Sequence, residues 1–148
     1  MIGQISIKTK LGWINATEEK GRIIGIKFGK RKKNTSSKNL KKFRSSLNNY
    51  LSKKNKSINC KILLKGNSTQ KKIWKELKKI RFGKTKTYGE IAKKYKLSPR
   101  YIGKICGQNK IVLVIPCHRV IRSDSTLGGF SSPGGIKLKK KLLDFEKN

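Results

Sequence analysis

A core strand that stops at a proline is the feature that most constrains this chain. The apolar run at residues 111–115 is followed directly by Pro116, Cys117, His118 and Arg119. Proline fixes its own φ and has no backbone N–H, so we expect the strand to end or turn at Pro116. A fold built around this run delivers a thiol, a base and a fixed cation together at the end of a buried strand.

The neighbouring Cys117 and His118 predict reactive sulfur. Cysteine is a strong nucleophile only as a thiolate, and a nearby base or cation lowers its pKa. The other two cysteines, Cys60 and Cys106, cannot complete a set of pairs, and no Cys-x-x-Cys spacing occurs. We therefore expect free thiols in a reducing compartment. The three cysteines and one histidine lack finger-type spacing, so we expect no metal and no cofactor.

The charge balance indicates a polyanionic partner. The chain has 39 Lys and Arg against 7 Asp and Glu, a formal net charge of +32. Such an excess repels itself in a folded protein and favours nucleic acid, with an anionic membrane surface as the alternative. An AT-rich coding sequence would also raise the lysine content. No apolar run is long enough to span a membrane and no signal peptide opens the chain, so we expect a cytoplasmic protein without a membrane partner.

The length of 148 residues predicts one domain or two small ones, and Gly66-Asn67-Ser68 is the best boundary. We predict an N-terminal α/β sheet domain at 1–67 and a C-terminal domain at 68–148. In the first, alternating apolar residues predict strands around Ile5 and Ile7, and again after a hairpin turn at Gly21-Arg22. This second strand has its apolar positions at Ile24, Ile26 and Phe28. A third strand is predicted by the alternating positions Ile58, Cys60, Ile62 and Leu64.

On this interpretation Cys60 faces the core. A helix is predicted between the second and third of these strands by Leu40, Phe43, Leu47 and Leu51. Asn34 or Thr35 is available as its N-cap. The basic segment at residues 30–37 is expected to be a loop.

Four helices are predicted in the C-terminal part. Ser68 or Thr69 caps the first, and Thr87 with Glu90 forms a capping box for the second. Ser98 caps the third, with Pro99 at its first position. Their apolar faces hold Ile73, Trp74, Leu77 and Ile80, then Ile91, Ala92 and Tyr95, then Tyr101, Ile102 and Ile105. A glycine-rich loop at 123–135 leads to the last helix, with Ile136, Leu138, Leu142, Leu143 and Phe145.

The second and third of these helices, joined by a tight turn, are typical of a helix-turn-helix. The later helix carries Arg100 and Lys104, and a helix N-terminus favours phosphate. The alternative is an ordinary helical hairpin in a lysine-rich protein. Glu146, one of seven acidic residues, lies on the last helix and invites a role; a solvated terminal residue is the alternative.

Residues from about 69 to 146 resemble the O6-alkylguanine-DNA alkyltransferases, which are self-alkylating DNA repair proteins. The resemblance rests on an ordered set of motifs, of which the Pro-Cys-His-Arg-Val element is the most specific. They are Phe82-Gly83, Thr87-Tyr88, Arg100, Asn109, Ile115-Pro116-Cys117-His118-Arg119-Val120, Gly129-Phe130-Ser131 and Leu142-Leu143 with Glu146. The N-terminal half matches only in its order of strands and helix.

The resemblance implies a fold and a role for each matching residue. It implies a small antiparallel sheet plus helix, RNase H-like, followed by an α-helical domain containing a helix-turn-helix. Cys117 resembles the alkyl acceptor, and His118 the base that joins Glu146 to Cys117 through a water. Tyr88 resembles the residue that displaces the 3′ phosphate and supports the extruded nucleotide. The charge on the departing guanine oxygen would be neutralised by a proton from the Tyr88 hydroxyl or by a hydrogen bond from the Ser131 amide.

Further roles follow from the same resemblance. Arg100 resembles the finger that fills the gap in the base stack, and Asn109 the hinge between recognition helix and active-site strand. Lys104 and Arg119 are expected to contact DNA. The guanine pocket is expected to comprise the backbone of Cys117 and three further residues, Val120, Phe130 and Ser131.

The chain departs from the family pattern at three places. Lys110 follows Asn109 where proline is usual, which would loosen the hinge turn. Phe130 replaces a frequent tyrosine, and the loop at 131–135 is longer than the usual Ser-Gly-Gly form. Cys106 lies outside the motifs, and we expect it to pack within its helix.

These observations predict a monomeric, single-turnover methyltransferase that moves the alkyl group of O6-methylguanine in duplex DNA to Cys117 after nucleotide flipping. A non-catalytic helix-turn-helix module is the second hypothesis, but such relatives lack the motif cysteine. A basic structural protein would not need the apolar run before Pro116. A cysteine hydrolase brings its Cys and His from distant positions, whereas here they are neighbours.

Overall fold

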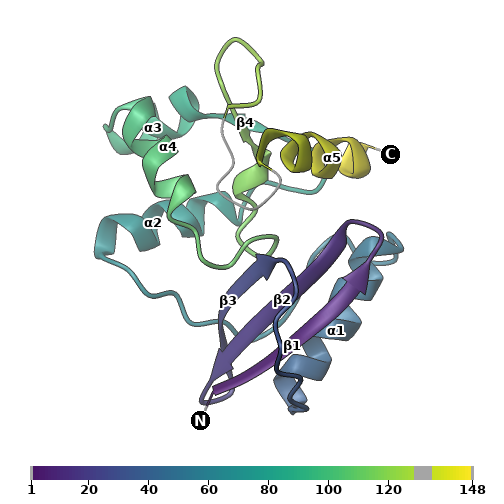
Figure 1. Ribbon diagram of the computed structural model, residues 1–148. Helices are drawn as coiled ribbons and strands as arrows, with labels where there is room; N and C mark the ends of the chain where they lie inside the picture. Colours follow the sequence, from purple (N-terminus) through teal and green to yellow (C-terminus); the bar gives the residue numbers. More distant parts are fainter. Residues whose placement is uncertain (1, 129–134, 148) are drawn as a thin grey trace. The chain divides into compact units, whose positions relative to one another are not determined.

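The computed structural model describes residues 2–128 and 135–147 (Figure 1). Contacts divide the chain into two compact units. One comprises Met1–Lys65 with Lys110–Val114, and the other Gly66–Asn109 with Ile115–Asn148. The predicted boundary at residue 67 would place Lys110–Val114 in the C-terminal domain, whereas the contacts assign these residues to the N-terminal unit.

The N-terminal unit is a three-stranded antiparallel sheet covered by one helix. The sequence predicts a small sheet with one helix, but it predicts no strand at residues 12–19 and places the third strand at residues 58–64 instead. Strands β1 (Ile2–Thr9), β2 (Gly12–Glu19) and β3 (Arg22–Phe28) lie in the order β1-β2-β3, and α1 (Lys38–Leu51) packs against them (Figure 1). The core between sheet and helix contains fully buried Ile14, Ile23, Ile26, Leu40, Phe43 and Leu47. The hairpin turn is centred on Lys20 and Gly21, both with positive φ, one residue before the predicted pair.

Two details of this unit differ from the prediction. A β-bulge shifts the register between Thr17 and Glu18, so Ile23 rather than Ile24 is fully buried. The N-cap of α1 is Ser37, whose side chain accepts a hydrogen bond from the Leu40 N–H, and not Asn34 or Thr35.

The predicted strand at residues 58–64 is wrong. This segment has one isolated parallel bridge, between Ile23 and Ile62, made by bonds from the Ile23 N–H to Lys61 and from the Leu63 N–H to Ile23. Because no longer ladder forms, Cys60 is half-buried instead of facing the core.

The buried run before Pro116 is also not a strand. Ile111 makes an isolated bridge to Ile26, after which the chain turns: Leu113 has φ 73°, and the Val114 N–H donates to the Val112 carbonyl at 2.9 Å. All five residues are nonetheless buried. The apolarity of residues 111–115 therefore predicted their burial correctly, but the extended strand predicted for them does not form.

The C-terminal unit is mainly helical. Its helices are α2 (Ser68–Leu77), α3 (Tyr88–Tyr95), α4 (Pro99–Gly107) and α5 (Gly135–Lys147). Two short strands, β4 (Lys86–Thr87) and β5 (Val120–Ile121), pair in parallel, and a 3₁₀ turn, η1 (Cys117–Arg119), precedes β5. The predicted caps of α3 and α4 are confirmed, whereas α2 is capped by Asn67 in a capping box with Gln70.

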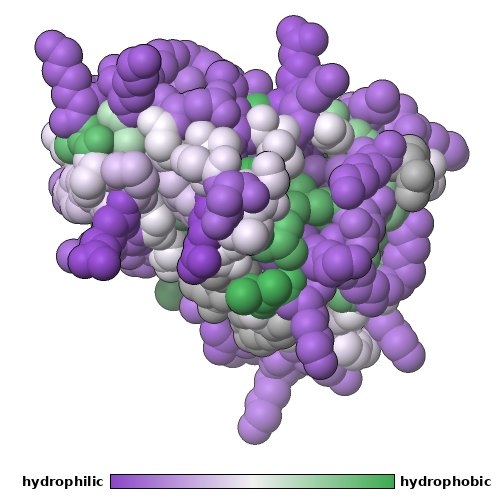
Figure 2. All heavy atoms as spheres, turned by 90° about the horizontal axis from the view of Figure 1, so that it is seen from above, coloured by the Kyte–Doolittle hydropathy of each residue, from purple (hydrophilic) through white to green (hydrophobic). Residues whose placement is uncertain are grey.

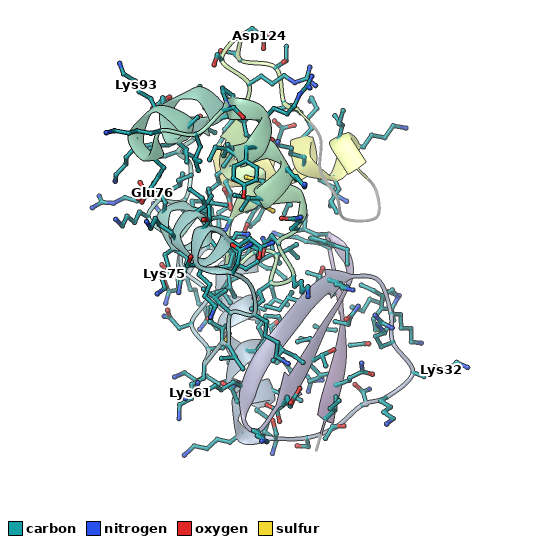
Figure 3. The ribbon with its side chains drawn as sticks, turned by 90° about the vertical axis from the view of Figure 1, so that its left-hand side faces the viewer. Lys32, Lys61, Lys75, Glu76, Lys93 and Asp124 are labelled. Atoms are coloured by element: carbon teal, nitrogen blue, oxygen red, sulfur yellow. The ribbon has the colours of Figure 1, made fainter. Side chains whose placement is uncertain are left out.

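Helix α2 holds both α3 and α4. The buried Glu76 carboxylate accepts hydrogen bonds from the Tyr95 hydroxyl at 2.7 Å and from Lys94 at 3.0 Å (Figure 3 labels Glu76). The Trp74 indole N–H donates to the Ile105 carbonyl at 3.1 Å. Hydrogen bonds to a buried carboxylate on one neighbour and a buried indole bond on the other fix the positions of the helices that carry Tyr88 and Arg100.

The surface is strongly hydrophilic. In the face seen in Figure 2, hydrophilic side chains predominate around smaller hydrophobic areas. Within residues 2–128 and 135–147, no helix is both long enough and apolar enough to cross a membrane.

Candidate active site

The thiol of Cys117 lies at the start of η1. The Cys117 N–H bonds to the Ile115 carbonyl at 2.8 Å and the Arg119 N–H to the Pro116 carbonyl at 3.0 Å, so the chain coils tightly directly after the proline. Cys117 and His118 therefore lie on a 3₁₀ turn and not at the end of an extended strand. Pro116 does end the preceding segment, but a 3₁₀ turn then presents the two side chains.

Glu146 on α5 binds two neighbours of the thiol. Its carboxylate accepts from His118 Nε2 at 2.9 Å, and from Arg119 Nε and Nη2 at 2.8 Å each. All three side chains are buried. Burial by itself would raise the pKa of Glu146, but the hydrogen bonds from Arg119 and His118 outweigh burial and lower this pKa to about 2.

These bonds define the protonation state of His118. Burial lowers the pKa of the imidazole, although the Glu146 carboxylate opposes this. The ring is therefore neutral at neutral pH. An ionised carboxylate only accepts hydrogen bonds, so the ring proton lies on Nε2 and the lone pair on Nδ1. His118 Nδ1 is thus the basic atom beside Cys117.

Arg119, which the sequence places among the DNA contacts, is buried and bonded within the protein. Its guanidinium is buried, with Nε and Nη2 on Glu146 and Nη1 donating to the Ile80 carbonyl at 2.7 Å. A cation bound in this way is unavailable to a phosphate. Arg119 instead offsets the charge of Glu146 and ties η1 to both α5 and the segment after α2.

Cys117 is a protonated thiol in the resting protein. Its side chain is almost completely buried, and burial raises the pKa of the thiol, while the Asn109 side chain and the Lys139 charge act in the opposite direction. Asn109, at the end of α4, also donates from Nδ2 to the Ile115 carbonyl at 2.9 Å. It thereby joins α4 to the backbone just before the thiol.

Lys139 is a site residue that the sequence analysis missed. It is fully buried on α5, and its Nζ donates to the Tyr88 hydroxyl at 3.2 Å. Burial lowers the pKa of Lys139 to about 8 and raises that of Tyr88 to about 12. A signal was present, because Lys139 lies one, three and four positions from Leu138, Leu142 and Leu143, on the apolar face of its helix.

A cavity of about 630 Å³ opens onto the thiol. Its walls come from α3, α4, η1 and the segment after β5. The lining residues are Tyr88, Pro99, Arg100, Gly103, Cys106, Gly107, Cys117, Arg122, Ser123 and Gly128. Such a volume suits a small planar ligand rather than a polymer. Cys106, expected to pack within its helix, is buried but also faces this cavity, and burial raises its pKa to about 12.

The other predicted site residues fall into three groups. Arg100 and Lys104 are exposed on α4, with Arg100 at the cavity. Val120 is fully buried in β5, paired with Lys86. Phe130 and Ser131 lie outside the described residues. Among the described residues, no group of three or more His, Cys, Asp or Glu side chains is placed to hold a metal ion.

Comparison with known proteins identifies relatives of this site. Residues 68–148 match the family model described as 6-O-methylguanine DNA methyltransferase, DNA binding domain. A methylated-DNA–protein-cysteine methyltransferase of Sulfolobus acidocaldarius is 45% identical over 98 residues, which is 66% of this chain and 61% of the relative. The matched part thus spans less than two thirds of that protein.

Two further comparisons extend over nearly the whole chain. A probable methylated-DNA–protein-cysteine methyltransferase of Acanthamoeba polyphaga mimivirus is 34% identical over 146 residues, covering 95% of this chain and 94% of the relative. The crystal structure of Mycobacterium tuberculosis OGT in complex with DNA superimposes with a TM-score of 0.87 at 26% identity, covering 98% of this chain and 92% of that one.

Proposed function

Because this chain belongs to the 6-O-methylguanine DNA methyltransferase family, we propose that it repairs DNA by moving the alkyl group of O6-methylguanine in duplex DNA to Cys117. The observation that supports this best is the buried Cys117 thiol facing a cavity, next to a neutral His118 whose proton is held on Nε2 by Glu146. A nucleophile, an oriented proton acceptor and a cavity that can receive the guanine are the parts that such a transfer needs.

The first step forms the thiolate. The Cys117 proton passes to His118 Nδ1 through a water, and Glu146 stabilises the imidazolium that results. Arg119 keeps Glu146 ionised by holding both carboxylate oxygens. The sulfur then attacks the alkyl carbon, a sulfur–carbon bond forms, and the bond from that carbon to guanine O6 breaks.

The second step neutralises the departing guanine, which takes the electron pair of the broken bond. Tyr88 donates its hydroxyl proton to the base, and Lys139 replaces that proton across their 3.2 Å contact. A phenol with a pKa of about 12 is a weak acid, so the adjacent ammonium, with a pKa of about 8, makes this transfer easier. The Ser131 amide is a further donor in this proposal, and Val120 and Phe130 border the guanine.

The substrate base must first leave the helix, since its O6 carbon lies inside the duplex. We assign α3 and α4 as a helix-turn-helix: Tyr88 displaces the 3′ phosphate, Arg100 fills the gap, Lys104 contacts the backbone, and Asn109 is the hinge. Flipping costs a few kcal/mol, which a stacked guanidinium partly offsets. The thioether product is stable, so each monomer acts once.

Intact mass spectrometry tests the reaction directly. The protein is incubated with duplex DNA containing O6-methylguanine, and we expect one added methyl group, which peptide mapping assigns to Cys117. Cys117→Ala should remain unmodified while binding the duplex normally. Unchanged mass of the wild-type protein with tight binding would instead identify a lesion sensor without transfer activity.

Arg100→Ala separates the base-flipping role from the chemistry. Arg100 is exposed at the cavity, so its loss should leave the thiol environment intact. We expect the rate of repair in duplex DNA to fall at least tenfold, with little change in the reaction with free O6-benzylguanine. Equal losses on both substrates would contradict the finger role.

A further inference from the structure

Alkyl transfer makes no use of the charge on the N-terminal unit. This unit holds about half of the 39 basic residues but only two of the seven acidic ones, Glu18 and Glu19. Glu18 is buried, and Glu19 is paired with Lys65 at 3.3 Å. The exposed positive charge elsewhere on this unit therefore has little acidic charge to offset it.

Four consecutive basic residues, Lys30, Arg31, Lys32 and Lys33, form a segment that we call the basic strap. It joins β3 to α1, and all four side chains are exposed. Figure 3 shows Lys32 pointing away from the sheet into solvent. The Lys30 ammonium lies 4.7 Å from the centre of the Trp13 ring, so a cation–π contact orients the first of them.

Hydrogen bonds hold the start of the strap to the sheet. The Gly29 N–H donates to the Trp13 carbonyl at 2.7 Å, and Asn15 Nδ2 donates to the Gly29 carbonyl at 3.0 Å. These contacts fix the chain just before Lys30. They also continue the pairing of β2 with β3 by one residue beyond the end of the strand.

Further hydrogen bonds hold Arg31 of the strap, and the chain just after the strap, along β1. The Ser6 hydroxyl accepts from the Arg31 N–H at 2.9 Å and donates to the Arg31 carbonyl at 3.2 Å. The Ser6 N–H donates to Asn34 Oδ1 at 3.1 Å, and the Thr35 N–H to the Gln4 carbonyl at 2.6 Å. The strap thus covers an edge strand, and its backbone is ordered before any partner binds.

The chemistry of the strap favours a phosphate backbone. Binding to an ordered segment avoids most of the entropy cost of fixing a flexible loop. Residues 29–37 include no apolar side chain to insert among lipid tails, which a membrane-surface element needs. A run of Lys and Arg without apolar neighbours is typical of contacts to nucleic acid phosphates that do not read sequence.

We propose that the basic strap is a second phosphate-binding element, which contacts the backbone of duplex DNA independently of α3 and α4. It adds affinity without sequence preference and increases the number of counterions released on binding. The proposal concerns binding alone, so it does not depend on alkyl transfer to Cys117.

The test compares two variants of the full chain on undamaged duplex DNA across a range of salt concentrations. One replaces Lys30, Arg31, Lys32 and Lys33 by Gln, which leaves the backbone hydrogen bonds of the strap available. The matched control replaces four exposed lysines scattered over the same unit, Lys27, Lys41, Lys54 and Lys61, also by Gln. Both variants lose the same net charge.

We expect the strap variant to reduce the slope of log K against log salt by about 3.6, since each of the four phosphate contacts contributes roughly 0.9. The control should reduce it by less than about 1. Equal changes in the two variants, or none, would overturn the proposal by showing that only total charge matters. Binding of the same variants to vesicles of phosphatidylcholine and phosphatidylserine is measured as well. If the strap variant loses more affinity for these vesicles than for DNA, the proposal is overturned.

Folding is checked on the same samples. The two variants should unfold at the same temperature as each other, because they lose the same charge. Both should react with free O6-benzylguanine at the wild-type rate, because their substitutions lie outside the unit that holds Cys117. If the quadruple variant unfolds, the pair Lys32→Gln and Lys33→Gln, beyond the Arg31 contacts to Ser6, replaces it, with an expected reduction in slope of nearly 2.

Discussion

Glu146 shows how one buried carboxylate determines the state of the residues around the thiol. It keeps the His118 proton on Nε2 and holds Arg119 away from solvent. Adjacent residues in the Cys-His-Arg motif thus have different roles in the proposed reaction: Cys117 is the nucleophile, His118 is the base, and Arg119 maintains the charge of the carboxylate that orients the base.

Replacing Glu146 by Gln tests this arrangement through stability. The variant leaves the Arg119 cation buried without its counter-charge, so we expect a loss of about 3–5 kcal/mol in the free energy of unfolding at pH 7. Asp144→Asn, an exposed acid on the same helix, should cost less than about 0.5 kcal/mol. Chemical denaturation measures both, and similar losses would contradict the assigned pairing.

The contribution of the Glu146 carboxylate should also appear in how the stability of the wild-type protein changes at acid pH. The pKa of Glu146 is lowered from an ordinary 4.5 to about 2, so its contribution to stability is complete above pH 4.5 and is lost as the pH falls toward 2. The variant lacks this dependence, and the difference in stability between the two proteins should shrink over that interval.

Lys139 is expected to reduce stability while serving the reaction. Its pKa is lowered from an ordinary 10.5 to about 8 because the charged form is buried, so the cost is present below pH 8 and disappears as the pH rises toward 10.5. Lys139→Met should therefore raise the free energy of unfolding at pH 7 by roughly 1–3 kcal/mol and slow alkyl transfer.

Lys137→Met is the matched control, since Lys137 is exposed on the same helix. It should change neither stability nor rate. A destabilised Lys139→Met protein would mean that the contact with Tyr88 and the attraction to the thiols outweigh the cost of burial.

At the scale of elements, short helices are fixed by their caps and by buried contacts with α2. Thr87 accepts from the Glu90 N–H at 3.0 Å at the start of α3, directly before Tyr88. Helix α4 ends at Gly107, and the side chain of Asn109, two residues beyond this end, donates a hydrogen bond to the Ile115 carbonyl. Each helix therefore positions a site residue at one of its ends, where the end geometry matters most.

The cap of α3 can be tested against the cap of α1. Thr87→Ala and Ser37→Ala each remove one side-chain bond to a helix N-terminus, and each should cost about 1 kcal/mol in unfolding free energy. Only Thr87→Ala should slow alkyl transfer, because Tyr88 follows that cap. If both variants transfer at equal rates, the start of α3 does not limit the position of Tyr88.

At the scale of the whole molecule, the net charge of +32 opposes folding and favours DNA. Salt should therefore have two opposite effects. Between about 50 and 500 mM salt, we expect the unfolding temperature to rise as self-repulsion is screened. The affinity for duplex DNA should fall steeply over the same interval, because the release of counterions becomes less favourable as the salt concentration rises. Calorimetry measures the unfolding temperature and fluorescence anisotropy measures the affinity. An affinity independent of salt would contradict an electrostatic contribution to DNA binding.

Much of the fold was predictable because its signals are local. The helical spacing of Leu40, Phe43 and Leu47 predicted α1, and the Thr87 and Ser98 caps predicted where α3 and α4 begin. Such patterns depend on neighbours within one or two turns. The strand predictions were weaker: a bulge displaced Ile24, and residues 58–64 and 111–115 lack the ladders that their alternation or apolarity suggested.

By itself, the sequence determined that a thiol, a base and a proline stop lie together, because those residues are adjacent in the chain. Only the tertiary structure decided what each side chain faces. Glu146 is 27 positions from Arg119, and Lys139 is 51 positions from Tyr88, so no local pattern shows that the first pair is a buried ion pair or that the second is a hydrogen bond. Burial and distant partners set the protonation of these groups, and both arise only when α5 packs against η1 and α3.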